Sequence, residues 1–176
     1  MYKKYLELES AISKVSYPKY ILGNIKQYLI DNYSDNDMTQ IYIVDSDNEN
    51  IFVIKYNLII ELNRKNYRVP VLVYLPILFP IYPPEFYIEA KSNYNYLNVN
   101  SFYKDIINSN DLRINLDYFM EYDSNKINIS EIIDNLMINF TQNFPIYKAK
   151  YNKSKYSGKC ILDYSKAIIV KLPKKK

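Results

Sequence analysis

The sequence predicts an α+β fold: two N-terminal helices, an antiparallel four-stranded meander sheet, a proline-rich turn and a C-terminal helix. Two observations lead to this prediction. Apolar residues recur at helical spacing near both ends of residues 1–147, and runs rich in Ile, Val and Tyr, joined by short polar connections, fill the middle. A length of 176 residues suits one domain over residues 1–147 with a lysine-rich C-terminal extension over residues 148–176.

The two N-terminal helices are predicted from apolar spacing. The first is expected from Tyr2 to about Ser13. The second is expected to start at Pro18, a residue type favoured at the first helical position, and to end near Tyr33. Its apolar stripe consists of Ile21, Ile25, Tyr28 and Leu29.

Three strands are predicted from β-branched and aromatic runs. They cover Gln40 to Val44, Ile51 to Leu62 and Tyr67 to Leu75. In the polar connections 45–50 and 63–66, Asn and Asp are expected to take the positive-φ positions usually given to Gly, so that the strands form two hairpins. The following segment, residues 78–84, holds three prolines and predicts a rigid turn before a short fourth strand over residues 85–89.

The remaining chain is predicted to be irregular over residues 91–125, apart from a short extended piece from Leu112 to Phe119. The C-terminal helix is expected to begin with Ser130 as its N-cap and to run to about Asn143. Its apolar face consists of Ile132, Ile133, Leu136, Met137 and Phe140. Residues 167–170, Ala-Ile-Ile-Val, predict either a late strand or an amphipathic patch.

The composition excludes much enzymology. The chain has no histidine, so histidine bases, Ser-His-Asp triads, Cys-His dyads and histidine metal sites are absent. The single cysteine, Cys160, excludes intrachain disulfides and zinc ribbons and is interpreted as an incidental thiol. A polar N-terminus and the lack of a long apolar run predict a soluble, cytoplasmic protein.

The charge is unevenly distributed along the chain. From Lys148 onward there are ten lysines and one acidic residue, Asp163, a net charge of +9, whereas residues 1–147 carry −5. Lysines interleaved with Tyr151, Tyr156 and Tyr164 are one pattern for binding an anionic membrane surface or nucleic acid. The alternative is an ordinary solvated tail.

One motif carries a resemblance to a known family. The strand from Tyr67 is followed by Phe-Pro-x-x-Pro-Pro at residues 79–84, and this arrangement resembles the core of ubiquitin-conjugating enzymes. Active members have a catalytic cysteine in an Ile-Cys-Leu-Asp pattern, downstream of a His-Pro-Asn motif. Here residues 114–117 read Ile-Asn-Leu-Asp, so Asn115 stands where the thiol would be, and no histidine exists. An amide cannot form a thioester, so the chain resembles the catalytically inactive variants, the UEV domains, and no cofactor is expected.

Within that family the chain is most similar to the N-terminal domain of the ESCRT-I tumour susceptibility protein. The shared features are the Tyr-x-Val-Pro strand start at residues 67–70, the proline-rich turn, the altered active-site strand at residues 114–119, the helix starting at Ser130 and a closing Phe-Pro-Ile-Tyr at residues 144–147. The resemblance implies a module of endosomal sorting that binds ubiquitin and late-domain-type peptides of the Pro-Ser/Thr-Ala-Pro kind, and association with endosomes.

The resemblance also implies two sets of binding residues. The peptide set is Leu62, Tyr67, Arg68, Pro70, Lys91, Tyr94, Pro145, Ile146 and Tyr147. The ubiquitin set is Tyr42, Val44, Asp45 and Tyr87. The chain departs from the family pattern at four positions, where Leu62, Arg68, Lys91 and Phe144 replace Tyr, Asn, Thr and Pro, so a changed peptide preference is expected.

Other readings remain open at this point. The chain could be a non-catalytic cofactor of an active ubiquitin-conjugating enzyme, with or without other ESCRT-I subunits as partners. It could be a conjugating enzyme for a ubiquitin-like modifier that uses Cys160. It could also be a lipid- or nucleic-acid-binding protein that acts through its basic extension.

Overall fold

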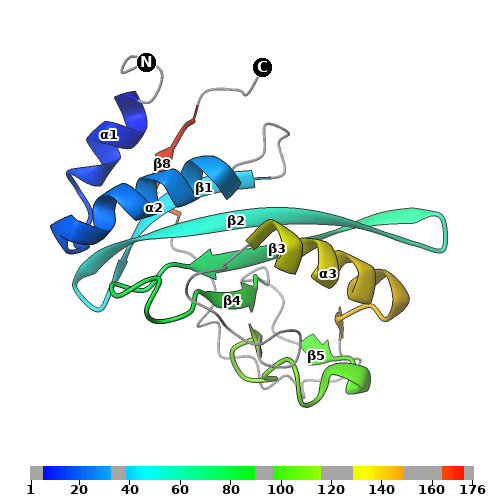
Figure 1. Cartoon of the computed structure of the whole chain (residues 1–176). Coiled ribbons are helices and arrows are strands. Elements are labelled where there is room, and N and C mark those ends of the chain that lie inside the picture. Colours follow the sequence, from blue (N-terminus) through cyan, green and yellow to red (C-terminus); the bar gives the residue numbers. More distant parts are fainter. Residues whose placement is uncertain (1–5, 33–38, 90–96, 116–128, 149–163, 173–176) are drawn as a thin grey trace.

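A six-stranded sheet runs through the molecule, with strand order β6-β4-β3-β2-β1-β8 and every neighbouring pair antiparallel (Figure 1). The computed structural model describes residues 6–32, 39–89, 97–115, 129–148 and 164–172. The strands of this sheet are β1 Thr39–Ser46, β2 Glu49–Leu62, β3 Lys65–Tyr74, β4 Glu85–Ile88, β6 Arg113–Ile114 and β8 Ile168–Val170. The predicted four-stranded meander is therefore present as β1 to β4, but β6 and β8 extend it at both edges.

Two tight hairpins join the first three strands. Asp47 and Asn48 connect β1 to β2 with φ of 52° and 66°, and Asn63 and Arg64 connect β2 to β3 with φ of 51° and 63°. Positive φ at both positions of a two-residue loop matches the twist of antiparallel strands. The prediction that Asp and Asn take these positions is confirmed at three of the four sites; Arg64 is the exception. Both loops are shorter than expected, because pairing continues to Ser46 and Lys65.

The strands present two different faces. We call the first the helix face, because α2 and α3 lie in front of the strands in Figure 1 and pack into one core with its aliphatic residues. Alternation along paired strands assigns to it the buried residues Ile41, Ile43, Phe52, Ile54, Leu58, Val71, Val73, Phe86 and Ile114. We call the opposite face the tyrosine face, and it carries Tyr42, Val44, Val53, Lys55, Leu72, Tyr74 and Tyr87.

The Tyr17 side chain connects the segment between α1 and α2 to the sheet through hydrogen bonds and ring stacking. Its hydroxyl donates a hydrogen bond to the carbonyl of Leu75 at 2.7 Å and accepts one from the backbone N–H of Phe52 at 2.8 Å. The Tyr17 and Phe52 rings stack with centroids 5.8 Å apart. Burial raises the pKa of Tyr17, so the hydroxyl stays protonated and keeps both bonds.

The helices differ from prediction mainly at their ends. The first, α1 Leu6–Ile12, ends close to the expected Ser13, and residues 2–5 of the expected helix lie outside the described residues. The second, α2 Lys19–Asn32, agrees with prediction, and Lys26 forms an ion pair with Glu9 of α1. The third, α3 Ile129–Gln142, begins before Ser130, so Ser130 lies in the first turn and is not the N-cap. The reason is that the Ile129 side chain is fully buried and extends the apolar face of the helix.

The segment predicted to be irregular contains ordered pieces. Strand β5 Leu97–Val99 pairs with β7 Ile146–Lys148 in a second, two-stranded sheet, and a 3₁₀ helix follows at Ser101–Tyr103. Of the extended piece expected from Leu112 to Phe119, only β6 is a strand, and the residues from 116 lie outside the described residues. None of the described helices is long and apolar enough to cross a membrane.

The last described segment returns to the sheet. Strand β8 pairs with β1 through Ile41 with Val170, Tyr42 with Ile169 and Ile43 with Ile168. Of the two alternatives for residues 167–170, the strand is therefore the one observed. Residues 164–172 are part of the folded unit, although they lie in the lysine-rich extension.

Candidate functional site

The position predicted to correspond to the catalytic cysteine lies at the end of the short strand β6. Asn115 follows this strand, its side chain is exposed, and its backbone N–H donates to the carbonyl of Ile106 at 2.7 Å. The preceding loop is closed by a hydrogen bond from the Leu112 N–H to the Asn108 carbonyl at 2.8 Å, and Leu112 is buried with φ of 60°. A carboxamide has no ionisable nucleophile, so this position cannot carry a thioester.

The described residues offer little other catalytic chemistry. They include neither histidine nor cysteine, because Cys160 lies outside them. Among these residues no group of three or more Asp, Glu, His or Cys side chains could hold a metal ion.

The tyrosine face collects three of the four residues expected to contact ubiquitin. Tyr42 is opposite Val53, which is opposite Tyr74, so these positions share one face across three strands. The Tyr74 ring packs edge-on against Tyr87 with centroids 5.3 Å apart. Val44 lies on the same face of β1, and Asp45 follows at the exposed end of that strand.

These residues differ in accessibility. Tyr87 is half-buried, and its pKa is raised to about 12, mainly by burial and further by the neighbouring Glu85 carboxylate. Tyr42 is only 8% exposed, and burial raises its pKa, with a smaller contribution from Glu89. The Tyr164 ring lies edge-on to Tyr42 at a centroid distance of 5.5 Å. A ligand can therefore reach Tyr87 more readily than Tyr42.

Two aromatic rings meet where the peptide site is predicted. The rings of Tyr67 on β3 and Phe144 after α3 meet edge-on with centroids 5.4 Å apart, and Tyr67 remains 41% exposed. Pro145, next in the chain, is buried, and Ile146 is partly buried. Phe144, which replaces the first closing proline of the family pattern, thus supplies an aromatic wall beside Tyr67.

A scaffold missed by the sequence analysis holds this closing segment. The Asn100 side chain donates to the carbonyl of Phe144 at 2.8 Å, and its backbone N–H donates to the carbonyl of Pro145 at 2.8 Å. The hydroxyl of the fully buried Tyr103 lies 2.8 Å from the carbonyl of Asn139 and 2.6 Å from that of Asn143, at the C-terminus of α3. Nothing in the local pattern of a lone Asn or Tyr predicts these contacts between distant segments.

The structure does not gather the whole predicted peptide set. Alternation places Leu62 and Tyr67 on the helix face but Arg68 and Pro70 on the opposite face. The backbone of Tyr147 pairs with Asn98, and its side chain lies outside the described side chains. Lys91 and Tyr94 also lie outside the described residues.

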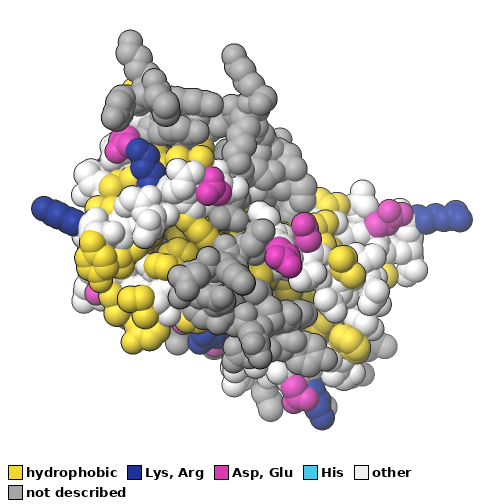
Figure 2. All heavy atoms as spheres, in the orientation of Figure 1, with side chains coloured by type: hydrophobic (Ala, Val, Ile, Leu, Met, Phe, Trp, Pro, Cys, Tyr) yellow, Lys and Arg dark blue, Asp and Glu magenta, His cyan; other side chains and the backbone are white. Residues whose placement is uncertain are grey.

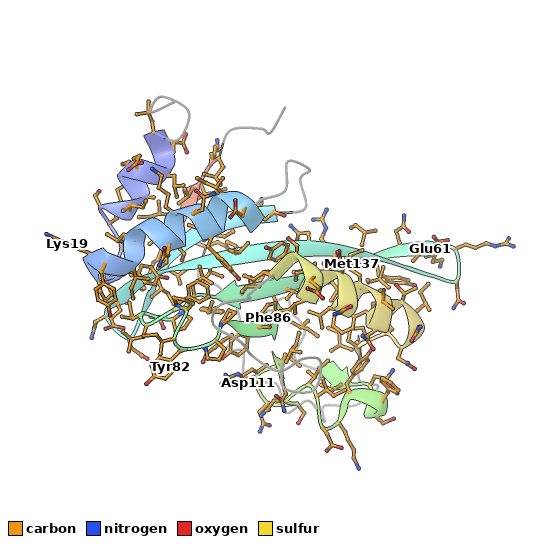
Figure 3. All side chains as sticks on the ribbon, in the orientation of Figure 1. Lys19, Glu61, Tyr82, Phe86, Asp111 and Met137 are labelled. Atoms are coloured by element: carbon orange, nitrogen blue, oxygen red, sulfur yellow. The ribbon has the colours of Figure 1, made fainter. Side chains whose placement is uncertain are left out.

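A third surface was not predicted. Large apolar side chains are exposed on α2 and the proline-rich turn, and Figure 2 shows apolar groups gathered over these elements at the left of the face in view. We call them the turn patch; they are Tyr20, Leu78, Ile81 and Tyr82. Figure 3 shows Tyr82 at the rim of the molecule, whereas Phe86, only a few residues later, lies in the interior. The turn contains a cis peptide bond between Phe79 and Pro80.

Comparison with known protein families gives a match over most of the chain. The model of the UEV domain family matches residues 7–148, which span α1 to β7 and include Asn115 and both predicted binding sets. No curated protein matches the sequence. Strand β8 and Tyr164 lie beyond the matched residues.

Proposed function

The chain belongs to the UEV domain family, and on that premise we propose that it is a binding module for ubiquitin and for proline-containing late-domain-type peptides in endosomal sorting. Members of this family have the fold of ubiquitin-conjugating enzymes and are typically inactive. The exposed amide of Asn115 agrees with a non-catalytic role for this chain.

The observation that carries the ubiquitin part is the aromatic surface on the tyrosine face. Tyr74 and Tyr87 pack together, remain partly accessible and lie on the same sheet face as Val44. The adjacent Arg113 and Glu85 are exposed and 3.4 Å apart, which adds a charged rim. An aromatic centre with a polar rim is the usual anatomy of a protein-binding surface.

The peptide part is supported by the ring pair Tyr67 and Phe144. Extended proline-rich segments are already close to their bound conformation and dock against aromatic side chains. The Asn100 hydrogen bonds fix the closing segment, so the aromatic wall is preformed. A preformed wall reduces the ordering cost of binding a short peptide.

The ubiquitin assignment is tested by titrating isotope-labelled ubiquitin with the full chain by NMR. Saturable shifts are expected, with at least a tenfold loss of affinity in Tyr87→Ala, because truncating a central aromatic anchor typically costs about 2 kcal/mol. The control is Tyr20→Ala, which removes an exposed tyrosine from α2 and should leave affinity unchanged. An absence of shifts at millimolar chain, or equal losses in both variants, contradicts the assignment.

The peptide assignment is tested by fluorescence anisotropy with a labelled Pro-Thr-Ala-Pro peptide. Saturable binding is expected for the wild type and loss of binding for Tyr67→Ala. Tyr82→Ala, which removes a similarly exposed ring from the turn patch, is the matched control. If the wild type does not bind, this peptide class is not the ligand. If Tyr67→Ala binds as tightly as the wild type, the site does not include Tyr67.

A second candidate function rests on the turn patch. Exposed apolar groups on a proline-fixed turn fit a protein partner, and we propose an active ubiquitin-conjugating enzyme as that partner, with the chain as its cofactor. Ile81, which is 65% exposed, is the residue to change. Ile81→Asp is expected to abolish stimulation of ubiquitin-chain formation while leaving the ubiquitin titration intact. No stimulation by the wild type across active conjugating enzymes would remove this function.

A further inference from the structure

The segment Tyr164–Leu172 occupies a surface that the family-matched domain would leave open. The match ends at residue 148, yet this later segment adds β8 to the edge of β1. We call it the C-terminal strap. An added strand uses the hydrogen-bonding groups of a sheet edge, which otherwise accept other extended chains.

A polar anchor holds the start of the strap. The Tyr164 hydroxyl donates to Glu89 Oε1 at 2.5 Å and accepts from Lys55 Nζ at 2.6 Å, and Lys55 and Glu89 are themselves paired at 3.0 Å. The side chains of Lys55 and Glu89 are only 14% and 9% exposed. Such a largely buried charged pair is stabilised by a third hydrogen-bonding group, so this position favours a tyrosine over a phenylalanine.

Apolar and backbone contacts hold the end of the strap. Val170 and Leu172 are buried in the core, and the backbone N–H of Lys171 donates to Glu7 Oε2 at 3.1 Å. Between the two anchors the strap is thinly held, because Ile168 and Ile169 are exposed and β8 has three paired residues. The docked strap is therefore a small unit at the sheet edge, of the kind that opens locally at low cost.

The docked strap covers part of the ubiquitin set. Tyr164 packs against Tyr42, and β8 takes the edge of β1 at Ile41, Tyr42 and Ile43. Tyr74 and Tyr87, two and three strands further along the sheet from β1, stay partly accessible. One half of the tyrosine face is thus covered by the chain itself and the other half is available.

We propose that the C-terminal strap is a built-in competitor that limits ligand access to the Tyr42 half of the tyrosine face. The identity of the ligand as ubiquitin rests on the proposed function. While the strap is docked, ubiquitin contacts only the Tyr87 half. The apparent affinity of ubiquitin for the whole tyrosine face is then its affinity for the open form multiplied by the fraction of molecules in which the strap is open.

The test compares full chains that differ at the two anchors. Tyr164→Ala removes the polar anchor, and Leu172→Asp removes an apolar one. The matched control is Phe102→Ala, which removes an exposed ring from the 3₁₀ helix, outside both the turn patch and the tyrosine face. Two quantities are measured: ubiquitin affinity by NMR titration, and hydrogen exchange of the backbone amides of Ile168, Ile169 and Val170, which reports docking independently of ubiquitin.

The expected result is faster amide exchange in the strap and an increase in ubiquitin affinity of at least threefold in both anchor variants, with neither change in the control. Faster exchange with unchanged or weaker affinity overturns the competition and leaves ubiquitin binding in place. Slow exchange in both variants overturns the anchoring. If ubiquitin binds no variant, the ubiquitin assignment fails, and the competition fails with it.

Discussion

The two faces of the central sheet are made by the same strands but differ in chemistry. In the middle of the sheet, the helix face carries mainly aliphatic and phenylalanine side chains that are almost fully buried, such as Phe52, Ile54 and Phe86. On the tyrosine face, rings alternate with charges, and hydroxyls contact carboxylates, as Tyr164 does with Glu89. The comparison teaches that the helix face contributes mainly buried apolar area to stability, whereas the tyrosine face also presents polar groups with which a ligand can interact.

The largest expected effect is on the helix face. Phe52→Ala should lower the free energy of unfolding by about 3 to 5 kcal/mol, because it leaves a cavity beneath the Tyr17 ring. Tyr87→Ala, on the partly accessible face, should cost clearly less. Urea denaturation of both variants measures the difference, and equal losses would mean that the two faces contribute alike to stability.

A smaller effect is expected from one hydroxyl group. Tyr17→Phe should cost about 1 to 3 kcal/mol, because the buried backbone groups of Phe52 and Leu75 each lose a partner. On the other face, Tyr42→Phe loses a part-buried bond to Gln40 at 3.0 Å and should cost less than about 1 kcal/mol. Thermal unfolding of the pair provides the measurement. A Tyr42→Phe loss as large as that of Tyr17→Phe would contradict the contrast.

The pH dependence of stability should respond differently to salt for Tyr87, on the tyrosine face, and for Tyr103, which is buried in the 3₁₀ helix. The pKa values of Tyr103 and Tyr87 are both raised to about 12, so each stabilises the fold below pH 10, and this stabilisation is lost as the pH rises toward 12. Burial alone acts on Tyr103, whereas Tyr87 also responds to Glu85, Arg113 and Asp111.

Replacement of either tyrosine by Phe should therefore flatten the alkaline loss of stability. At about 1 M salt the Tyr87 contribution should shrink, because its charged neighbours are screened, and the Tyr103 contribution should persist. Denaturation midpoints between pH 9 and pH 12, at low and high salt, measure both contributions. Identical salt responses would show that the charges near Tyr87 have no effect on its titration.

The smallest effect is expected at the rim of the tyrosine face. Arg113→Ala breaks an exposed ion pair with Glu85 and should change stability by less than about 0.5 kcal/mol. Its effect on ubiquitin should appear in the association rate and its salt dependence. Stopped-flow binding at two salt concentrations checks this, with Lys104→Ala as a control for the loss of an exposed cation elsewhere.

Much of the fold could be predicted because local pattern determines it. The stripe of Ile21, Ile25 and Leu29 predicts α2, and β-branched runs with Asn and Asp in the turns predict the two hairpins. The proline-rich motif and Asn115 identified the family, and the family model confirms that identification.

The unpredicted parts depend on contacts between distant residues. The pairing of Val99 with Ile146, and the burial of Tyr42 under Tyr164, join segments far apart in the chain, and no periodicity encodes them. The start of α3 was misplaced because Ser130 is a good cap residue, but burial of Ile129 outweighs that local preference. The candidate sites were thus predicted as sets of residues, and their accessibility came only from the structure.

The length of β2 has a consequence for recognition. This one strand carries Val53, on the tyrosine face, and ends at Leu62, near the hairpin that also carries Tyr67 (Figure 1). At about 3.3 Å per residue, these positions are about 30 Å apart on a single rigid element. A cargo that carried both ubiquitin and a proline motif would gain affinity through bivalence only if its linker could span that distance. The length of β2 would then set the minimum linker length between the two signals on the cargo.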